Sequence, residues 1–214
     1  MPGLYIITGS NGAGKSTAGA DYLPSHIQQQ VQIFDGDKLF MQKRSELWKS
    51  GIKSHKECKK LAFEFVENTF DELVENSLVK QTDFAYEGHF TNEATWDVPR
   101  RFKSAGYSIH LVFFGLLNTD LSELRVIFRS QEGGHYVDPR TLTDNFYGNL
   151  EKLDLHFSMF DSVQIVDTSE TKHKVICVLY NGDVASAIDT FSIPDWFRDN
   201  LKMITAKIES KNSN

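Results

Sequence analysis

LYIITGSNGAGKST, residues 4–17, joins a short apolar run to a glycine-rich loop. Residues 4–7 have the apolar character typical of a buried parallel strand. Residues 9–16 fit the pattern G-x-x-x-x-G-K-[ST] at every position. A strand that runs into this loop and then into a helix predicts a P-loop nucleotide-binding fold, and the alternative is a glycine-rich turn without a ligand.

The loop has a chemical reason for each residue type. Its glycines let the backbone coil through conformations that a Cβ would penalise, so that successive N–H groups point at one anion. The positive end of the following helix stabilises phosphate there. We expect Lys15 to reach the β and γ phosphates of ATP and the Ser16 hydroxyl to ligate Mg²⁺. The expected nucleotide contacts are Gly9, Ser10, Asn11, Gly12, Ala13, Gly14, Lys15, Ser16 and Thr17.

Bulk composition narrows the class of protein. The 214 residues suit one α/β domain, and the 40% hydrophobic fraction is ordinary for a globular protein. A net charge of −6 disfavours a nucleic-acid partner. The two cysteines, Cys58 and Cys177, form neither a metal-ligand spacing nor a disulfide framework. No signal peptide or membrane span is expected, so we predict a soluble cytoplasmic protein.

Apolar periodicity outlines alternating strands and helices beyond the loop. Strands are expected at residues 31–34, 83–86, 107–114, 163–167 and 174–180, and helices at 15–22, 38–50, 55–78, 93–104 and from 194 onward. This alternation predicts a three-layer α/β fold, with a mainly parallel sheet and helices on both faces. We expect a single domain over 1–214, with a lid segment at about 118–150 inside it.

Ligands of such sheets bind at the carboxyl ends of the strands, and several polar residues follow strands here. Asp37 is placed to accept the proton of an attacking hydroxyl, although Asp-Gly-Asp is also ordinary turn chemistry. Asp35 is expected either to cap that turn or to assist the metal. Glu87 could bind the hydroxyls of an acceptor, and the alternative is an exposed charge at the rim. The same rule selects residues 167–169.

The segment 121–150 contains the candidate lid. Arg125 and Arg129 are four residues apart and so share a face of a helix. They lead into Gly133-Gly134-His135, where the glycines offer a hinge. Kinases use mobile arginines to cover the transferring phosphoryl group, which supports a catalytic role for both side chains. The alternative is a solvated charged helix followed by a loop.

Together these residues resemble the zeta-toxin family of P-loop kinases over most of the chain. The motifs that carry the resemblance are LYIITGSNGAGKST, FDGDK, FAYEGHF, GYSIHLVFFGL, RVIFRSQEGGHYV and FDSVQIVDTS. The resemblance implies a nucleoside-kinase-like fold with a lid, ATP and Mg²⁺, and its best understood members phosphorylate UDP-N-acetylglucosamine. Many relatives act with a small antitoxin and others appear solitary, so the resemblance makes a small antitoxin a candidate partner.

Carried over by position, the resemblance implies a role for several residues. Asp37 corresponds to the catalytic base, Glu87 to the substrate-binding acid, and Arg125 with Arg129 to the lid residues on the phosphates. Residues 167–169, including Asp167 and Ser169, correspond to the loop near the adenine.

Three departures from the family pattern concern the acceptor and the lid. Glu87-Gly88-His89 stands where the family has Glu-Thr-Thr, so Glu87 and His89 would form an altered acceptor site. Asp144-Asn145 replaces a pair of arginines, with Arg140 close by as a candidate substitute. Asp35-Gly36-Asp37 replaces Asn-x-Asp and adds a carboxylate near the metal.

Two functions remain open at this point. In the first, the protein is a kinase that transfers the γ-phosphoryl group of Mg-ATP to a hydroxyl of a small molecule, such as a nucleotide sugar. In the second, it is a nucleotide-gated regulatory module with little or no transfer activity, which the loss of charge from the lid favours.

Overall fold

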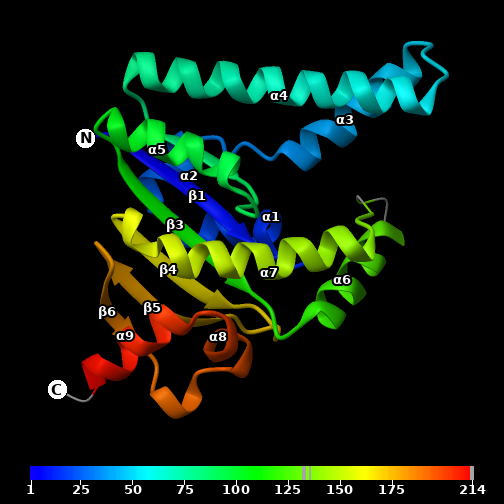
Figure 1. The fold of residues 1–214 in the computed structure, drawn as a ribbon. Helices are drawn as coiled ribbons and strands as arrows, with labels where there is room; N and C mark the ends of the chain where they lie inside the picture. Colours follow the sequence, from blue (N-terminus) through cyan, green and yellow to red (C-terminus); the bar gives the residue numbers. More distant parts are fainter. Residues whose placement is uncertain (132–133, 135, 213–214) are drawn as a thin grey trace.

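A computed structural model describes residues 1–131, 134 and 136–212 of the chain (Figure 1). Within these residues, six strands form one sheet in the order β2-β1-β3-β4-β5-β6. Four of the strands are parallel, and β5 and β6 extend the sheet in antiparallel fashion. The strands are β1 (Gly3–Gly9), β2 (Phe84–Glu87), β3 (Ser108–Gly115), β4 (Ser162–Asp167), β5 (Lys174–Tyr180) and β6 (Asp183–Ala187).

Helices cover both faces of the sheet. The α-helices are α1 (Lys15–Ala18), α2 (Ser25–Gln30), α3 (Gly36–Lys49), α4 (His55–Lys80), α5 (Asp97–Ser104), α6 (Thr119–Gln131), α7 (Pro139–His156), α8 (Asp195–Asn200) and α9 (Lys202–Asn212). Short 3₁₀ turns η1 to η4 lie at Gly19–Tyr22, Glu93–Trp96, Phe157–Met159 and Thr190–Ser192. Thr8 of β1 bonds to Asn149 of α7, whereas its neighbour Ile7 faces Gly19 of η1. Because successive strand residues point to opposite faces, α7 and η1 lie on opposite sides of the sheet.

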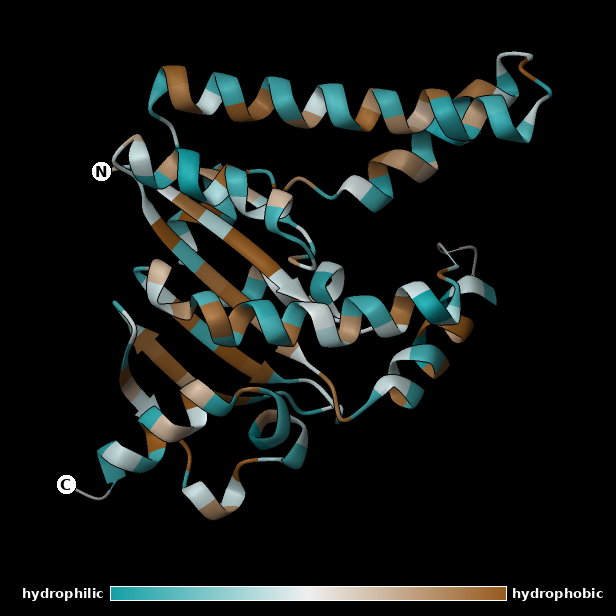
Figure 2. Ribbon diagram, in the orientation of Figure 1, coloured by the Kyte–Doolittle hydropathy of each residue, from teal (hydrophilic) through white to brown (hydrophobic). Residues whose placement is uncertain are grey.

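The central strand β1 forms the middle of the core. All seven of its residues are buried, and it pairs with β2 on one side and β3 on the other. Figure 2 shows the hydrophobic strands of the sheet and the mixed surface of the long helix α4. The parallel register brings Gly9 opposite Phe114 and Gly115 opposite Asp167, so the carboxyl ends of these strands share one edge. The predicted mainly parallel three-layer fold is confirmed.

The helices α3 and α4 form an antiparallel arm beside β2. Asp35 caps α3 by accepting a hydrogen bond from the amide of Lys38, and Ser54 caps α4 by accepting from Glu57. In Figure 1 this arm lies on one side of the carboxyl edge of the sheet, and α6 lies on the other. The arm and α6 thus flank the loop that follows β1.

One predicted strand is wrong. Residues 31–34 make a single bridge, between Phe34 and Tyr86, instead of a strand. The segment is short because α2 ends at Gln30 and α3 begins at Gly36, which leaves little extended chain to pair with β2. Helix α2 itself was not expected, since Pro24 reads as the end of a helix, whereas here it precedes the first turn of the next one.

Several other boundaries differ from the expectation. The first helix becomes a 3₁₀ turn at Gly19, and the helix expected from residue 93 has a 3₁₀ first turn. The last helix is broken at Leu201 into α8 and α9. Strand β6 was missed because it is an edge strand with mostly exposed, non-alternating residues. No helix in the described part of the chain has the length and apolarity that crossing a membrane requires.

Candidate active site

The loop after β1 has the backbone conformation of an anion cradle. Gly9, Gly12 and Gly14 have φ angles of 131°, 72° and 84°, which L side chains rarely adopt. At Gly9 an added Cβ would also lie 2.1 Å from the carbonyl oxygen of Phe114. The buried Oγ of Ser10 has no hydrogen-bond partner among the described residues. This cradle with an orphaned polar atom fits a phosphate chain.

Side chains from elements far away in the sequence form hydrogen bonds to the carbonyl groups of the loop. The Oγ of Ser122 in α6 donates to the carbonyl of Asn11 at 2.6 Å, and the Oγ1 of Thr168 donates to the carbonyl of Ala13 at 3.0 Å. Both hydroxyls are buried. Because these carbonyls are bonded on the outside, the amides of the loop stay directed at the ligand.

Helix α7 also contacts the loop. The side-chain amide of Asn145 donates to the Oδ1 of Asn11 at 2.9 Å. The Oδ1 of buried Asn149 accepts from the Thr8 hydroxyl at 3.2 Å and from the amide of Phe90 at 2.6 Å. The Nδ2 of Asn149 lies 3.0 Å from the Nδ1 of His89. Asn149 therefore joins β1, the segment after β2 and α7 at one point.

Lys15 folds back over the loop. Its Nζ donates to the carbonyls of Gly9 and Ser10 at 2.8 and 2.9 Å. Burial lowers the pKa of Lys15 to about 8; Arg129 adds to this shift, while the carboxylates Glu87, Asp37 and Asp35 oppose it. The ammonium is thus held at the mouth of the cradle, where the negative charge of a phosphate would raise its pKa again.

Glu87 lies beside the hydroxyl expected to bind metal. The Oγ of Ser16 donates to the Oε2 of Glu87 at 2.8 Å. Burial raises the pKa of Glu87, and the hydrogen bond from Ser16 opposes that shift. No group of three His, Cys, Asp or Glu side chains suited to a metal occurs among the described residues. The hydroxyl and carboxylate oxygens suit Mg²⁺, which commonly takes only one or two protein ligands and fills its remaining positions with phosphate and water.

Asp35 is the N-cap residue before α3, and Asp37 lies in the first turn of that helix. Asp35 accepts from the amide of Lys38 at 2.9 Å, which is the capping role left open for it in the sequence. Asp37 is exposed and lines a hollow of about 270 Å³. The hollow is also lined by Lys15, Asp35, Gly36, Phe40, Phe63, Val66, Glu87, Gly88 and His89. The structure thus brings Lys15, Asp37 and Glu87 around one cavity.

The two lid arginines lie on α6, as the four-residue spacing predicts. Arg125 donates to the carbonyl of Ser169 at 2.9 Å and approaches that of Gly12 at 3.4 Å, so it ties the loop to the segment after β4. Arg129 is exposed and acts electrostatically on Lys15. Of the predicted hinge, Gly133 and His135 lie outside the described residues, as do residue 132 and the last two residues.

The segment after β4 forms an Asx turn next to the loop. The Oδ1 of Asp167 accepts from the amide of Ser169 at 2.9 Å and from its hydroxyl at 2.5 Å. Thr168 between them donates to the carbonyls of Ala13 and Gly115. Asp167 and Ser169 are thereby fixed beside the cradle, and their contact with the nucleotide stays a prediction.

Sequence reasoning missed the polar residues that support the loop. Ser122 and Asn145 fall in the expected lid, and Asn149 near its end reads as an ordinary polar helix residue. A signal was available for Asn149, because it lies among apolar residues on the buried face of α7. No sequence pattern signals the pairing of Ser122 or Asn145 with Asn11.

These features define a P-loop protein of the kinase type. It has a phosphate-binding loop after β1, the acidic side chain of Asp37 in α3, and the basic residues Lys15 and Arg129 beside the loop. The chain belongs to the zeta-toxin family, because a sequence model described as "Zeta toxin" matches residues 1–184. No curated protein sequence matches the chain.

Solved structures share this fold at low sequence identity. A chain of the PezAT chromosomal toxin–antitoxin system of Streptococcus pneumoniae is 19% identical with a TM-score of 0.64, and the match covers 100% of this chain and 87% of that one. A chain of the AvrRxo1-ORF1:ORF2 complex with ATP is 15% identical with a TM-score of 0.63. That match covers 94% of this chain but 64% of the other.

Proposed function

We propose that this protein is an ATP-dependent kinase that transfers the γ-phosphoryl group to a hydroxyl of a small molecule. The observation that carries the proposal is the shared hollow, in which Lys15 at the mouth of the cradle, Asp37 and Glu87 face one cavity. Phosphoryl transfer needs mainly positioning and charge stabilisation, which this arrangement offers.

Each residue has a separate task in the proposed reaction. The loop amides and Lys15 bind the phosphates, and Arg129 approaches the same charge from α6. Asp37 orients the acceptor hydroxyl and takes its proton. Ser16, with Glu87 or Asp35, would hold Mg²⁺, which would supply charge neutralisation for the phosphates. Arg125 acts as a positioning residue, since its bonds go to the backbone of the loop and of Ser169.

Replacement of Asp37 by Asn tests the base. We expect kcat to fall by roughly 10²–10⁴-fold, because general-base catalysis contributes about that much. The dissociation constant of ATP should stay near the wild-type value. Transfer of γ-labelled phosphate into a fractionated cell extract measures kcat, and calorimetry measures the dissociation constant of ATP. A wild-type rate for the Asn variant on a true acceptor would contradict the assignment.

Acceptor, partner and location remain proposals. The family resemblance alone favours a nucleotide sugar such as UDP-N-acetylglucosamine as the acceptor, whereas the residues that line the site favour an uncharged alcohol. A chain of the PezAT toxin–antitoxin system shares the fold, which supports a small antitoxin as partner. The proposed cytoplasmic location rests on the composition, in which the two cysteines form no disulfide framework. Co-expression with the product of an adjacent small open reading frame tests the partner, and loss of transfer activity in the complex is the expected result.

A second candidate function is a nucleotide-gated regulatory module. The observation in its favour is that Asn145, at a position where the family has an arginine, bonds to Asn11 of the loop and offers no charge to a phosphate. Tight Mg-ATP binding without formation of ADP in the presence of any metabolite fraction would support this alternative.

A further inference from the structure

A second cavity adjoins the hollow that contains Lys15 and Asp37. It measures about 490 Å³ and shares Val66, Glu87, Gly88 and His89 with that hollow. It lies between α4, the end of β2 and the segment 92–98, so it continues the first hollow away from the nucleotide. A molecule whose hydroxyl reaches Asp37 would extend into this second cavity.

The second cavity is lined mainly by apolar and aromatic side chains. Phe34 packs against Phe70, and Phe70 against Tyr86, at ring-centroid distances of 5.1 and 5.3 Å. The full lining is Phe34, Val66, Glu67, Phe70, Tyr86, Glu87, Gly88, His89, Phe90, Asn92, Ala94, Thr95 and Val98. An aromatic wall of this size suits an apolar or aromatic body.

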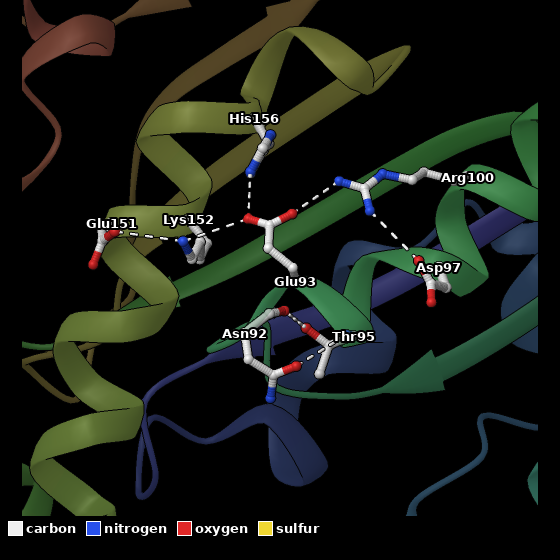
Figure 3. A network of polar contacts seen from close by, with 8 residues as sticks. All are labelled: Asn92, Glu93, Thr95, Asp97, Arg100, Glu151, Lys152 and His156. Carbon is white, nitrogen blue, oxygen red and sulfur yellow. Dashed lines mark hydrogen bonds and ion pairs between the residues drawn. The ribbon is translucent and has the colours of Figure 1, made fainter.

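The outer wall of this cavity is fastened to α7. Figure 3 shows Glu93 of η2 between Arg100 of α5 and two residues of α7. Its carboxylate lies 3.0 Å from Arg100, 3.5 Å from Lys152 and 3.4 Å from His156. These ion pairs connect the segment that contributes Ala94 and Thr95 to α5 and α7.

The charges around the two cavities disfavour an anionic acceptor. Neither Lys nor Arg lines the second cavity, and its acidic side chains are those of Glu67 and Glu87. Lys15 is the one basic residue lining the first hollow, and ATP would engage it. A phosphate on the acceptor would therefore face carboxylates without a counter-charge.

We infer that the acceptor is an alcohol with an apolar body and without any anionic group, whose body lies in the aromatic cavity while its hydroxyl faces Asp37. This inference rests on the proposed kinase function. In the reaction, the acceptor oxygen forms a bond to the γ-phosphorus as the bond from that phosphorus to the β–γ bridging oxygen breaks. Asp37 takes the hydroxyl proton, and ADP leaves. The class excludes nucleotide sugars, which carry a diphosphate.

A comparison of two acceptor groups tests the inference. The first group is 3-phenylpropan-1-ol and 2-amino-1-phenylpropane-1,3-diol, and the second is UDP-N-acetylglucosamine and glucose 1-phosphate. Phosphorylated product is measured by mass spectrometry, and binding by calorimetry with a nonhydrolysable ATP analogue present. We expect a kcat/KM at least tenfold higher for the first group. Higher kcat/KM for UDP-N-acetylglucosamine overturns the inference.

Two substitutions locate the binding. Ala94→Trp fills the cavity from its mouth and should lower kcat/KM for the phenyl alcohols at least tenfold, whereas Ala94→Ser should not. Glu67→Lys adds a cation to the lining and should improve binding of the anionic compounds several-fold. Glu72→Lys is the matched control, because Glu72 lies on the same helix outside the lining. Equal effects of both Lys variants contradict the proposed position.

The binding measurement separates the two proposals. If the phenyl alcohols bind, with loss of binding in Ala94→Trp, but no product forms with any acceptor, the ligand class is supported and the kinase function fails. If products form only with anionic acceptors, the kinase function stands and the ligand class fails. Absence of phenyl-alcohol binding also overturns the ligand class.

Discussion

The carbonyl oxygens on the outside of the phosphate loop accept hydrogen bonds that hold the loop in place. Asn11, Gly12 and Ala13 each have their carbonyl bonded by a side chain from another element. Without those donors, the peptide groups could rotate and the amides would lose their common direction. We therefore expect Ser122 and Thr168 to position the loop for a nucleotide.

Replacement of Ser122 by Ala tests this support. The change leaves the buried carbonyl of Asn11 without the 2.6 Å hydrogen bond from Ser122. An unsatisfied buried acceptor costs about 1–3 kcal/mol, so we expect ATP affinity to fall roughly fivefold or more. Ser130→Ala is the matched control, since Ser130 bonds to a carbonyl within the same helix and is remote from the loop. Equal ATP affinities for both variants would show that the loop needs no support from α6.

His89 should make stability depend on pH. Its folded-state pKa lies well below its usual value of about 6.5, so the unfolded chain binds the proton more readily. The contribution to stability is therefore present above pH 6.5 and is lost as the pH falls below it. Between pH 7.5 and 5.5 the loss is about 1 kcal/mol.

Urea unfolding at pH 7.5 and 5.5 measures this effect. In His89→Gln, whose side-chain oxygen can still accept from Asn149, the difference between the two pH values should shrink. The exposed His26→Gln is the control and should leave the difference unchanged. An unchanged difference in the His89 variant would mean that this histidine protonates as readily in the folded chain.

At the level of elements, α6 and α7 lie beside the phosphate loop and also form hydrogen bonds to it. Arg125 joins the loop to the turn after β4, and Asn145 joins it to α7. A lid that closed as one body from residue 118 to 150 would break these bonds. The bonds of Arg125 and of Asn145 therefore oppose a movement of this segment as one body.

The junction of β3 with α8 is a tight contact that Gly115→Ala should disrupt. A Cβ at Gly115 would lie 2.0 Å from the ring of Trp196. Overpacking of a buried site costs about 1–3 kcal/mol, so the free energy of unfolding should fall by that amount. Adding Trp196→Phe should recover part of the loss, because the smaller ring makes room and the indole nitrogen has no hydrogen-bond partner among the described residues. No recovery in the double variant would contradict the steric explanation.

At the level of the whole molecule, nucleotide binding should stabilise the fold, because the cradle is assembled from β1, α6, α7 and the end of β4. A ligand at 100 times its dissociation constant stabilises by about 2.7 kcal/mol, which corresponds to roughly 5–10 °C in Tm for a domain of this size. Thermal unfolding with and without Mg-ATP measures the shift. Lys15→Met should lose most of it, and a full shift in that variant would place the nucleotide elsewhere.

The sequence predicted the elements that depend on local patterns better than those that depend on distant partners. Long apolar runs gave β1, β3, β4 and β5, and clear helical periodicity gave α4, since these patterns are local. Strand β6 and the bridge at Phe34 depend on neighbouring strands for their partners, so local pattern misjudged both. Helix α2 was not predicted, because Pro24 was interpreted as the end of the preceding helix.

By itself, the sequence determined the phosphate loop, the α/β class and the rim on which Asp37 and Glu87 lie, because each follows from a contiguous segment and the parallel order of strands. Only the tertiary structure decided which side chains hold the loop and which side chains line the proposed acceptor cavity. The donors to Asn11 and Ala13 lie 111 and 155 residues away in the chain. The aromatic cavity likewise forms where α4, β2 and the segment after β2 meet. Contacts between residues so far apart leave no periodicity in the sequence, and packing alone brings them together.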